Sequence, residues 1–348
     1  MGVAAALAVS GMVLAGCGEP PEEGGGDAEK KFKACMVTDT GGVDDRSFNA
    51  SAWAGMQAAE KEGDGVEVDY VTSKAEADYE PNLKQQVQGK CDLTVAVGGL
   101  MADATAKVAE QEKDKQFAIV DAKIDSGNVY SMQFNTAQSA FQAGYLAAGM
   151  SKTGKVATYG GLKIPPVTIF MDGFAEGVAH YNKIKGKKVA VLGWNPATQN
   201  GSFAESFTDQ NKGKALTENF VSQGADIVFP VAGGTGLGTA STAQASKGKL
   251  TTIWVDFDGC ESAKDFCDVF LTSVVKNIPD AVKEAVLRAA NGEKGGAFLG
   301  TLENKGTFLA PYHEYDGKVD AALKSEVEAL GADITSGKIE IASKAQPA

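Results

Sequence analysis

The chain has 348 residues, of which 43% are hydrophobic and 22% charged, and its formal net charge at pH 7 is −12. These proportions are those of ordinary globular proteins, and the length suits about two domains, so wholesale disorder, collagen and coiled coils are excluded. An acidic chain repels nucleic-acid phosphates and we find no local basic patch, so no nucleic-acid partner is expected. Two histidines also exclude a histidine-rich metal site.

The N-terminus contains a short apolar run of small residues, VAAALAVSGMVLA (3–15). A membrane span needs about 20 residues, so this run is typical of a secretory signal, although no Lys or Arg precedes it. It ends in LAGC (14–17), which resembles the bacterial lipobox, whose cysteine is acylated. We expect a signal peptide over 1–16, a lipid on Cys17 that anchors the protein to the outer face of the cell membrane, and a flexible Pro-, Gly- and Glu-rich tether over 17–32. The alternative is a buried N-terminal helix.

Four further cysteines follow Cys17, and an even number in an exported chain suggests disulfide bonds. Cys35 and Cys91 each precede a strand-like run, and neighbouring parallel strands begin close together. Cys260 and Cys267 share one short loop. We therefore predict the pairs Cys35–Cys91 and Cys260–Cys267, with four free buried thiols as the alternative. No cysteine or histidine pair has the spacing of metal ligands, so neither a metal nor a cofactor is expected.

From residue 34 onward, short apolar runs alternate with helical patterns, which is typical of parallel sheets covered on both faces. The predicted strands are 34–37, 66–71, 93–97, 116–120, 129–133, 156–159, 188–192, 227–230, 252–255 and 269–273. The predicted helices are 47–62, 82–87, 101–110, 137–150, 167–181, 213–223, 238–246 and 278–288. The pattern runs twice, which predicts two doubly wound α/β domains. Such sheets bind ligands at the carboxyl ends of their strands, so the cleft between the domains is the expected site.

Polar and aromatic residues gather just after the predicted strands. In chain order they are Asp39, Phe48, Asp121, Trp194, Phe203, Phe207, the glycines of 232–238, Asp256 and Lys276. Carboxylates accept hydrogen bonds from hydroxyl or ring N–H groups, and exposed aromatic faces stack on flat rings. The set favours a pocket for a flat heterocycle that bears a sugar. Helix capping by Asp45 or Ser47, core packing and a structural ion pair are the alternatives for single residues.

No catalytic motif survives inspection. GMSKTGK (149–155) begins like a P-loop, but Val156 stands where Ser or Thr is required and the helix precedes the strand. GGTGLG (233–238) follows a strand and opens a helix, which suits binding of hydroxyl or phosphate groups by backbone N–H groups, but the dinucleotide fingerprint is incomplete. His180 and His313 lie far apart in the sequence. We expect a binding protein rather than an enzyme.

The segment VTDTGGVDDRSFNASAWAGM (37–56) resembles the opening signature of the basic membrane protein family of ABC-transporter substrate-binding lipoproteins, which includes the purine nucleoside receptor A type. Similar segments follow in order: SFTDQNKGKAL (206–216), GADIVFPVAGGTGLG (224–238), WVDFDG (254–259) and LTSVVKN (271–277). The resemblance extends from about Lys33 to the C-terminus. It implies a type I periplasmic-binding-protein fold, in which two doubly wound parallel-sheet lobes joined by a hinge close on a nucleoside.

The resemblance also implies which residues face the base. Asp39 matches a ligand-contacting carboxylate, and Asp121 matches the carboxylate that reads the base nitrogens. Phe48 and Phe207 match aromatic residues that sandwich the base. Phe203 is an alternative to Phe207, because each follows a serine.

For the sugar, the resemblance implies that Gly233, Asp256 and Lys276 hold the ribose hydroxyls, and Asn49 lines the same loop as Phe48. The implied ligand is a purine nucleoside (guanosine, inosine or adenosine), which a monomeric protein delivers to the permease subunits of an ABC transporter. A sugar or another small polar solute, a sensor lipoprotein without a transporter, and a nucleoside hydrolase are the alternatives. The expected lobes comprise residues 33–134 with 258–297, and 135–257 with 298–345.

Overall fold

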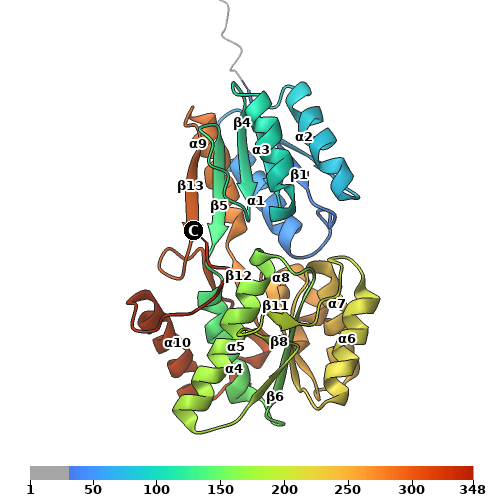
Figure 1. Ribbon diagram of the computed structural model, residues 1–348, viewed down its shortest axis with the longest axis vertical. Coiled ribbons are helices and arrows are strands. Elements are labelled where there is room, and N and C mark those ends of the chain that lie inside the picture. The colour runs from blue at the N-terminus through green and yellow to red at the C-terminus, as the bar shows by residue number, and fades with distance from the viewer. Residues whose placement is uncertain (1–30, 348) are drawn as a thin grey trace, which may run out of the picture. The chain divides into compact units, whose positions relative to one another are not determined.

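The computed structural model describes residues 31–347, which form one unit of the chain. The expected signal peptide over 1–16, the expected lipid on Cys17 and the tether up to residue 30 lie outside the described residues. Within residues 31–347, two six-stranded sheets form the centres of two lobes, and helices cover both faces of each sheet (Figure 1). This arrangement confirms the predicted class of two doubly wound α/β lobes.

The first sheet is parallel throughout and has the order β13-β5-β4-β3-β1-β2. Its strands are β1 (Phe32–Thr38), β2 (Val66–Thr72), β3 (Leu93–Val97), β4 (Gln116–Val120), β5 (Val129–Phe134) and β13 (Gly296–Gly300). The helices are α1 (Phe48–Glu62) and α9 (Ile278–Ala290) on one face, and η1 (Glu76–Asp78), α2 (Tyr79–Gln88), η2 (Gly99–Met101) and α3 (Ala102–Gln111) on the other. Side chains alternate along a strand, so Met36 packs with α1 and α9 whereas Val37 packs with α2 and α3.

The second sheet has the order β14-β12-β11-β10-β6-β7, and only the edge strand β14 is antiparallel to its neighbour. Its strands are β6 (Lys155–Gly160), β7 (Ala190–Leu192), β10 (Ile227–Val231), β11 (Thr251–Asp256), β12 (Phe270–Lys276) and β14 (Thr307–Leu309), and β8 (Trp194–Asn195) and β9 (Asn200–Gly201) form a separate hairpin. Its helices are α4 (Ala137–Met150), α5 (Pro165–Lys185), η5 (His313–Lys318) and α10 (Ala321–Thr335) on one face, and α6 (Gln210–Ser222), η3 (Gly233–Gly236), α7 (Leu237–Ala245), α8 (Gly259–Ser262) and η4 (Lys264–Val269) on the other.

The chain passes between the lobes after β5, after β12 and again after β13. The second of these crossings differs from the sequence-based expectation, which assigned 258–297 to the first lobe. β12 pairs with β11 and β14 of the second sheet instead. All seven residues of β12 are buried, and a strand that is buried along its whole length does not reveal which of two sheets it joins. We therefore propose lobes of 31–134 with 277–300, and of 135–276 with 301–347.

Both predicted disulfide bonds are present. Cys35 of β1 is bonded to Cys91, which precedes β3, with their Cα atoms 5.9 Å apart. β1 and β3 are neighbours in the parallel sheet, which is the arrangement that the sequence argument assumed. Cys260 and Cys267 close the loop that contains α8 and η4. The alternative of four free thiols is therefore wrong.

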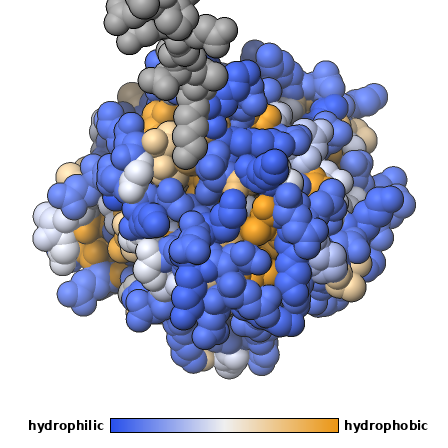
Figure 2. Space-filling model, turned by 90° about the horizontal axis from the view of Figure 1, so that it is seen from above, coloured by the Kyte–Doolittle hydropathy of each residue, from blue (hydrophilic) through white to orange (hydrophobic). Residues whose placement is uncertain are grey.

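The face of the molecule seen in Figure 2 is mainly hydrophilic. Figure 2 shows one face of the molecule, on which apolar residues appear as separate patches among polar ones. The exposed large hydrophobic side chains of the described residues are Tyr70, Ile184, Val221 and Leu299, and each belongs to a different helix or strand. None of the helices in residues 31–347 combines the length and the hydropathy that a membrane span requires.

Candidate functional site

A cavity lies between the lobes, where strands of both sheets end. All eight residues that the sequence predicts as ligand-binding line it: Asp39, Phe48, Asn49, Asp121, Phe207, Gly233, Asp256 and Lys276. Asp39 and Asp121 directly follow β1 and β4, and Asp256 and Lys276 are the last residues of β11 and β12. The carboxyl ends of parallel strands meet at one edge of a sheet, and the fold thereby brings together residues that are up to 237 positions apart (276 minus 39).

The cavity also has apolar walls that the sequence argument missed. Gly98 and Gly99 follow β3, and Ile164, Pro166 and Phe170 lie at the start of α5. Because Gly98 and Gly99 directly follow a predicted strand, their place at the cavity could have been predicted from the sequence. The residues of α5 follow a loop after β6, and only the fold reveals that this helix begins at the cavity.

The start of α1 places Phe48 and Asn49 at the cavity, and Asp45 fixes this start. The Asp45 carboxylate accepts hydrogen bonds from the backbone N–H groups of Ser47, Asn49 and Ala50 at 2.8–3.0 Å. These N–H groups have no partner within the helix, so the carboxylate replaces an ordinary N-cap side chain. Ser47 occupies the N-cap position, but its side chain accepts no capping hydrogen bond. Of the two predicted caps, Asp45 is the one that acts.

Asp39 and Asn49 form a polar pair in the cavity wall. The Asn49 side-chain amide donates to Asp39 Oδ1 at 2.7 Å, and the Gly41 N–H donates to the same oxygen at 3.1 Å. Burial raises the pKa of Asp39 to about 6, the two hydrogen bonds oppose this rise, and the neighbouring carboxylates add to it. Asn49 Oδ1 is buried without a hydrogen-bond partner. The pair therefore offers acceptor oxygens to a ligand. Because the pKa of Asp39 is raised to about 6, its carboxyl group can also carry a proton in weakly acidic solution.

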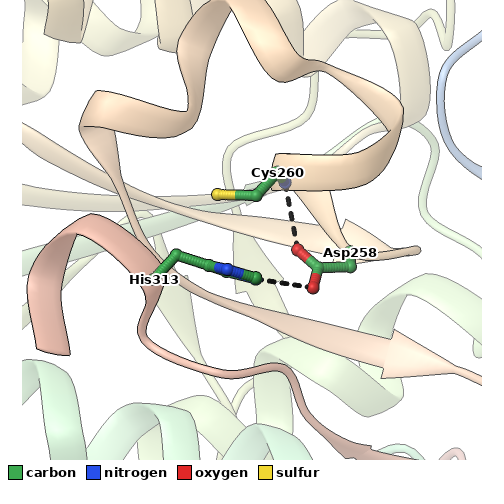
Figure 3. A group of neighbouring side chains, drawn as sticks. All are labelled: Asp258, Cys260 and His313. Atoms are coloured by element: carbon green, nitrogen blue, oxygen red, sulfur yellow. Dashed lines mark hydrogen bonds and ion pairs between the residues drawn. The ribbon is translucent and has the colours of Figure 1, made fainter.

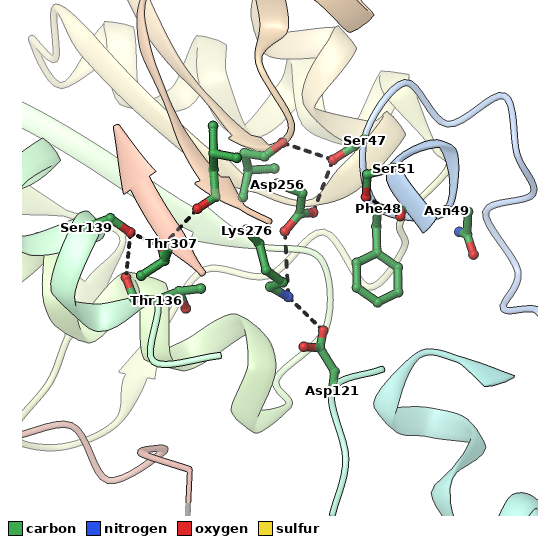
Figure 4. A network of polar contacts seen from close by, with 12 residues as sticks. Ser47, Phe48, Asn49, Ser51, Asp121, Thr136, Ser139, Asp256, Lys276 and Thr307 are labelled. Carbon is green, nitrogen blue, oxygen red and sulfur yellow. Dashed lines mark hydrogen bonds and ion pairs between the residues drawn. The ribbon is translucent and has the colours of Figure 1, made fainter. Parts of the chain in front are cut away.

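Lys276 holds two carboxylates together at the ends of three strands (Figure 4). Its Nζ lies 2.7 Å from Asp121 Oδ2 and 3.6 Å from Asp256 Oδ1, and its side chain is 3% exposed. Burial lowers the pKa of Lys276, but the facing carboxylates raise it more, with a net increase. Burial raises the pKa of Asp121, which Lys276 opposes. Lys276 thus stays a cation, 5.0 Å from the centre of the Phe48 ring.

Both carboxylates of this cluster occupy a strained backbone conformation. Asp121 has φ +68° and Asp256 has φ +66°, in the left-handed region that residues other than glycine seldom adopt. Such residues cost on the order of 1–3 kcal/mol each and persist where the surrounding structure holds them. Asp121 follows a strand of the first sheet and Asp256 ends a strand of the second, and two such residues at one cavity indicate that the fold keeps these side chains directed at the site.

Phe207 rather than Phe203 lines the cavity. The backbone of Phe203 pairs with Gly160, and its ring packs edge-on against Trp194 at 6.0 Å between centres. Trp194 is itself buried and donates from its indole nitrogen to Asp172 at 2.9 Å, so it belongs to the core rather than to the site. The geometry therefore favours Phe207 as the aromatic residue that the second lobe presents.

A second group of side chains, Asp258, Cys260 and His313, has its ligand-type atoms within 4.8 Å of one another (Figure 3). The sulfur of Cys260 is bonded to Cys267 and is therefore not a thiolate ligand. Asp258 accepts from the Cys260 N–H at 3.0 Å and contacts His313 Nε2 at 2.7 Å. These contacts cap α8 and attach η5 to it, which is a structural role.

Comparison with known proteins identifies relatives over most of the chain. Residues 32–309 match the family model described as "ABC transporter substrate-binding protein PnrA-like". The "ABC transporter nucleoside-binding protein BmpA" of Lactococcus lactis is 33% identical, over 98% of this chain and 98% of its own length. An uncharacterized lipoprotein of Pyrococcus furiosus is 30% identical, over 86% of this chain and 74% of its own length.

The fold has a solved counterpart in a solute-binding protein of an ABC transporter system from Aeropyrum pernix. The two structures superpose with a TM-score of 0.78 at 24% sequence identity, over 90% of this chain and 93% of that one. At this level of identity the likeness concerns the fold alone. It confirms the type I periplasmic-binding-protein fold that the family resemblance implied.

Proposed function

The chain belongs to the PnrA-like family of ABC transporter substrate-binding proteins, and we propose that it captures a purine nucleoside between its two lobes for delivery to a membrane permease. The family consists of binding proteins rather than enzymes. The observation that carries the proposal is the joint position of two aromatic side chains and a buried carboxylate–lysine cluster around one cavity. A nucleoside has one flat ring and one sugar, which these two features suit.

The base stacks between Phe48 of the first lobe and Phe207 of the second. Both side chains line the cavity and come from different lobes, so a base held between them draws the lobes together. Stacking of a base on an aromatic side chain contributes roughly 1–3 kcal/mol. A ligand without a ring would leave this contribution unused.

The ribose lies against Asp256, Lys276 and Gly233. Hydrogen bonds between its hydroxyl groups and a charged side chain contribute roughly 1.5–3 kcal/mol each. Gly233 begins η3, and its backbone has φ +51°. Its lack of a side chain leaves room for close approach of the sugar.

The structure suggests a different reader of the base edge from the one that the sequence implied. Asp121, the expected reader, is already paired with Lys276 at 2.7 Å. Asn49 has a buried oxygen without a partner, and its amide contacts Asp39. Figure 4 draws Asn49 and Lys276 on opposite sides of the Phe48 side chain. We propose that Asp39 and Asn49 bind the polar edge of the base, and that Asp121 positions Lys276 for the ribose.

The protein acts as a lipid-anchored monomer on the extracytoplasmic face of the membrane, with Cys17 as the acylated residue. The name of the Pyrococcus relative as a lipoprotein supports the anchor. The four exposed large hydrophobic side chains of residues 31–347 belong to four different helices or strands, which supports the monomer. Metabolic labelling with palmitate tests the anchor, and the label should be absent from Cys17→Ser.

Calorimetric titration with inosine tests the nucleoside proposal. Wild-type protein should bind with a stoichiometry of one, and Asp256→Ala should weaken binding by about 1.5–3 kcal/mol through the lost ribose contact. Asp258→Ala serves as the control, because it removes a carboxylate only two residues away that does not line the cavity. An Asp256→Ala protein with wild-type affinity would contradict the ribose assignment. Wild-type protein that ignores inosine, guanosine and adenosine would contradict the function.

A further inference from the structure

Ser47 makes contacts that its position in the helix does not require. It precedes α1, where a serine hydroxyl normally accepts a hydrogen bond from a backbone N–H group of the first turn. Asp45 accepts those bonds instead. The side chain of Ser47 is fully buried, and its hydroxyl lies 3.1 Å from the Val255 carbonyl oxygen and 3.1 Å from Asp256 Oδ2 (Figure 4).

These contacts cross from the first lobe to the second. Ser47 belongs to the first lobe, and β11, which ends with Val255 and Asp256, belongs to the second sheet. The preceding residue, Arg46, makes a second contact of this kind, since the Trp254 indole N–H donates to the Arg46 carbonyl oxygen at 3.3 Å. Arg46 adopts φ +55°, a conformation that an arginine rarely takes. The strained turn thus directs two consecutive residues at the end of β11.

We propose that Ser47 is a positioning residue that couples contact between the lobes to the orientation of Asp256. The inference rests on the proposed function, in which Asp256 holds the ribose. The single hydroxyl proton of Ser47 is shared between the Val255 carbonyl oxygen and Asp256 Oδ2, while Asp256 Oδ1 faces Lys276, so Ser47 fixes the rotation of the carboxylate. When the lobes separate, the hydroxyl leaves with the first lobe. Asp256 then keeps only its ion pair with Lys276 of the same lobe, and a bound nucleoside loses the orientation that Ser47 gives to this acceptor.

Ser51 provides a matched control. It lies one turn later in α1, is fully buried like Ser47, and donates to the Phe48 carbonyl oxygen at 2.7 Å within its own helix. Among residues 31–347, the hydroxyl of Ser51 makes no hydrogen bond to the second lobe that an alanine would remove. Ser51→Ala therefore reports the cost of deleting a buried hydroxyl from α1, and Ser47→Ala adds the loss of the contact between the lobes.

The experiment measures inosine association and dissociation by stopped flow with the full-length protein. Ser47→Ala should dissociate inosine roughly tenfold faster, as expected for a hydrogen bond to a charged group, while association changes little because the contact forms after encounter. Ser51→Ala should keep both rates. In an Asp256→Asn background, Ser47→Ala should have a much smaller effect, since the two residues act together. Equal effects of the two serine variants, unchanged dissociation in Ser47→Ala, or full additivity with Asp256→Asn would overturn the inference.

A ligand-free measurement separates this inference from the proposed function. Hydrogen exchange of residues 255–258 should be faster in Ser47→Ala than in wild type and unchanged in Ser51→Ala, because Val255 accepts from both Ser47 and the Phe257 N–H group. Failure of the wild-type protein to bind nucleosides would refute the proposed function. Identical exchange in the three proteins would refute the contact between the lobes.

Discussion

Asp172 and Asp256 are both buried carboxylates of the second lobe, but their surroundings differ. Asp172 lies inside α5 and accepts hydrogen bonds from Trp194, Gln199 and Ser343 at 2.7–2.9 Å. Asp256 ends a strand with φ +66°, faces the cavity, and is held by one cation and by a hydroxyl from the other lobe. A buried carboxylate with several neutral donors in a regular helix stabilises the fold. One in a strained conformation at a cavity indicates a binding role.

The comparison is tested most severely by Lys276→Met. The substitution leaves Asp121 and Asp256 buried without their cation, which should lower the free energy of unfolding by about 3–5 kcal/mol and abolish nucleoside binding. Lys283→Met is the control, because its ion pairs with Glu62 and Asp280 lie at the surface and should contribute about 0–1 kcal/mol. Urea unfolding and calorimetric titration measure the two effects. Wild-type affinity in Lys276→Met would contradict the account.

Asp172→Ala tests the structural role of the buried carboxylate in α5. Three donors lose their acceptor, so the free energy of unfolding should fall by about 1–3 kcal/mol. Inosine affinity should stay at the wild-type value, since Asp172 does not line the cavity. Asp172→Asn keeps one acceptor oxygen and should recover part of the stability. Normal stability combined with weak inosine binding would reverse the assignment of the two carboxylates.

Asp39 makes stability depend on pH. The pKa of Asp39 is about 6 in the folded protein, compared with 3.8 for an aspartate in the unfolded chain. Between these two pH values the folded protein therefore binds more protons than the unfolded protein. Stability due to this group is therefore present at low pH and is lost as the pH rises from about 4 to about 6. The loss should amount to about 3 kcal/mol at most and should be missing from Asp39→Asn. The prediction would be contradicted if the free energy of unfolding changed with pH by the same amount in the wild type and in Asp39→Asn across this range.

The two candidate stacking residues offer a smaller effect. Phe207→Ala should weaken inosine binding by about 1–3 kcal/mol, because one face of the base loses its partner. Phe203→Ala should lower stability and leave the affinity near that of the wild type, since its ring packs on Trp194 outside the cavity. Titration of both variants with inosine distinguishes them. The reverse result would assign the stacking role to Phe203.

Much of the site could be predicted because one rule governs it. Parallel strands place their ends together, so Asp39, Asp121, Asp256 and Lys276 could be grouped from their positions after strands. The sheet to which β12 belongs could not be predicted, since a strand that is buried along its whole length fits either sheet. The capping by Asp45, which leaves Ser47 for the other lobe, depends on a local competition between two good capping residues. Here the ordinary capping rule fails at the functional site.

Two strands and one helix near the C-terminus were not predicted from the sequence, for different reasons. β13 is an edge strand with one buried residue and β14 has only three residues, so neither forms the continuous apolar run that indicated the other strands. Helix α10 was not predicted either, although its buried residues recur at helical spacing: Leu323, Val327, Leu330 and Ile334. That spacing was a signal that could have been used.

The most direct test of nucleoside capture is a thermal-shift measurement on the wild-type protein against guanosine, inosine, adenosine, free ribose and glucose. A ligand at 100 times its dissociation constant stabilises the folded state by about 2.7 kcal/mol, which should raise the melting temperature by a few degrees. The account predicts this rise with at least one of the three nucleosides and none with ribose or glucose. A melting temperature that rises only with ribose or glucose, or that rises with none of the five compounds, would contradict nucleoside capture.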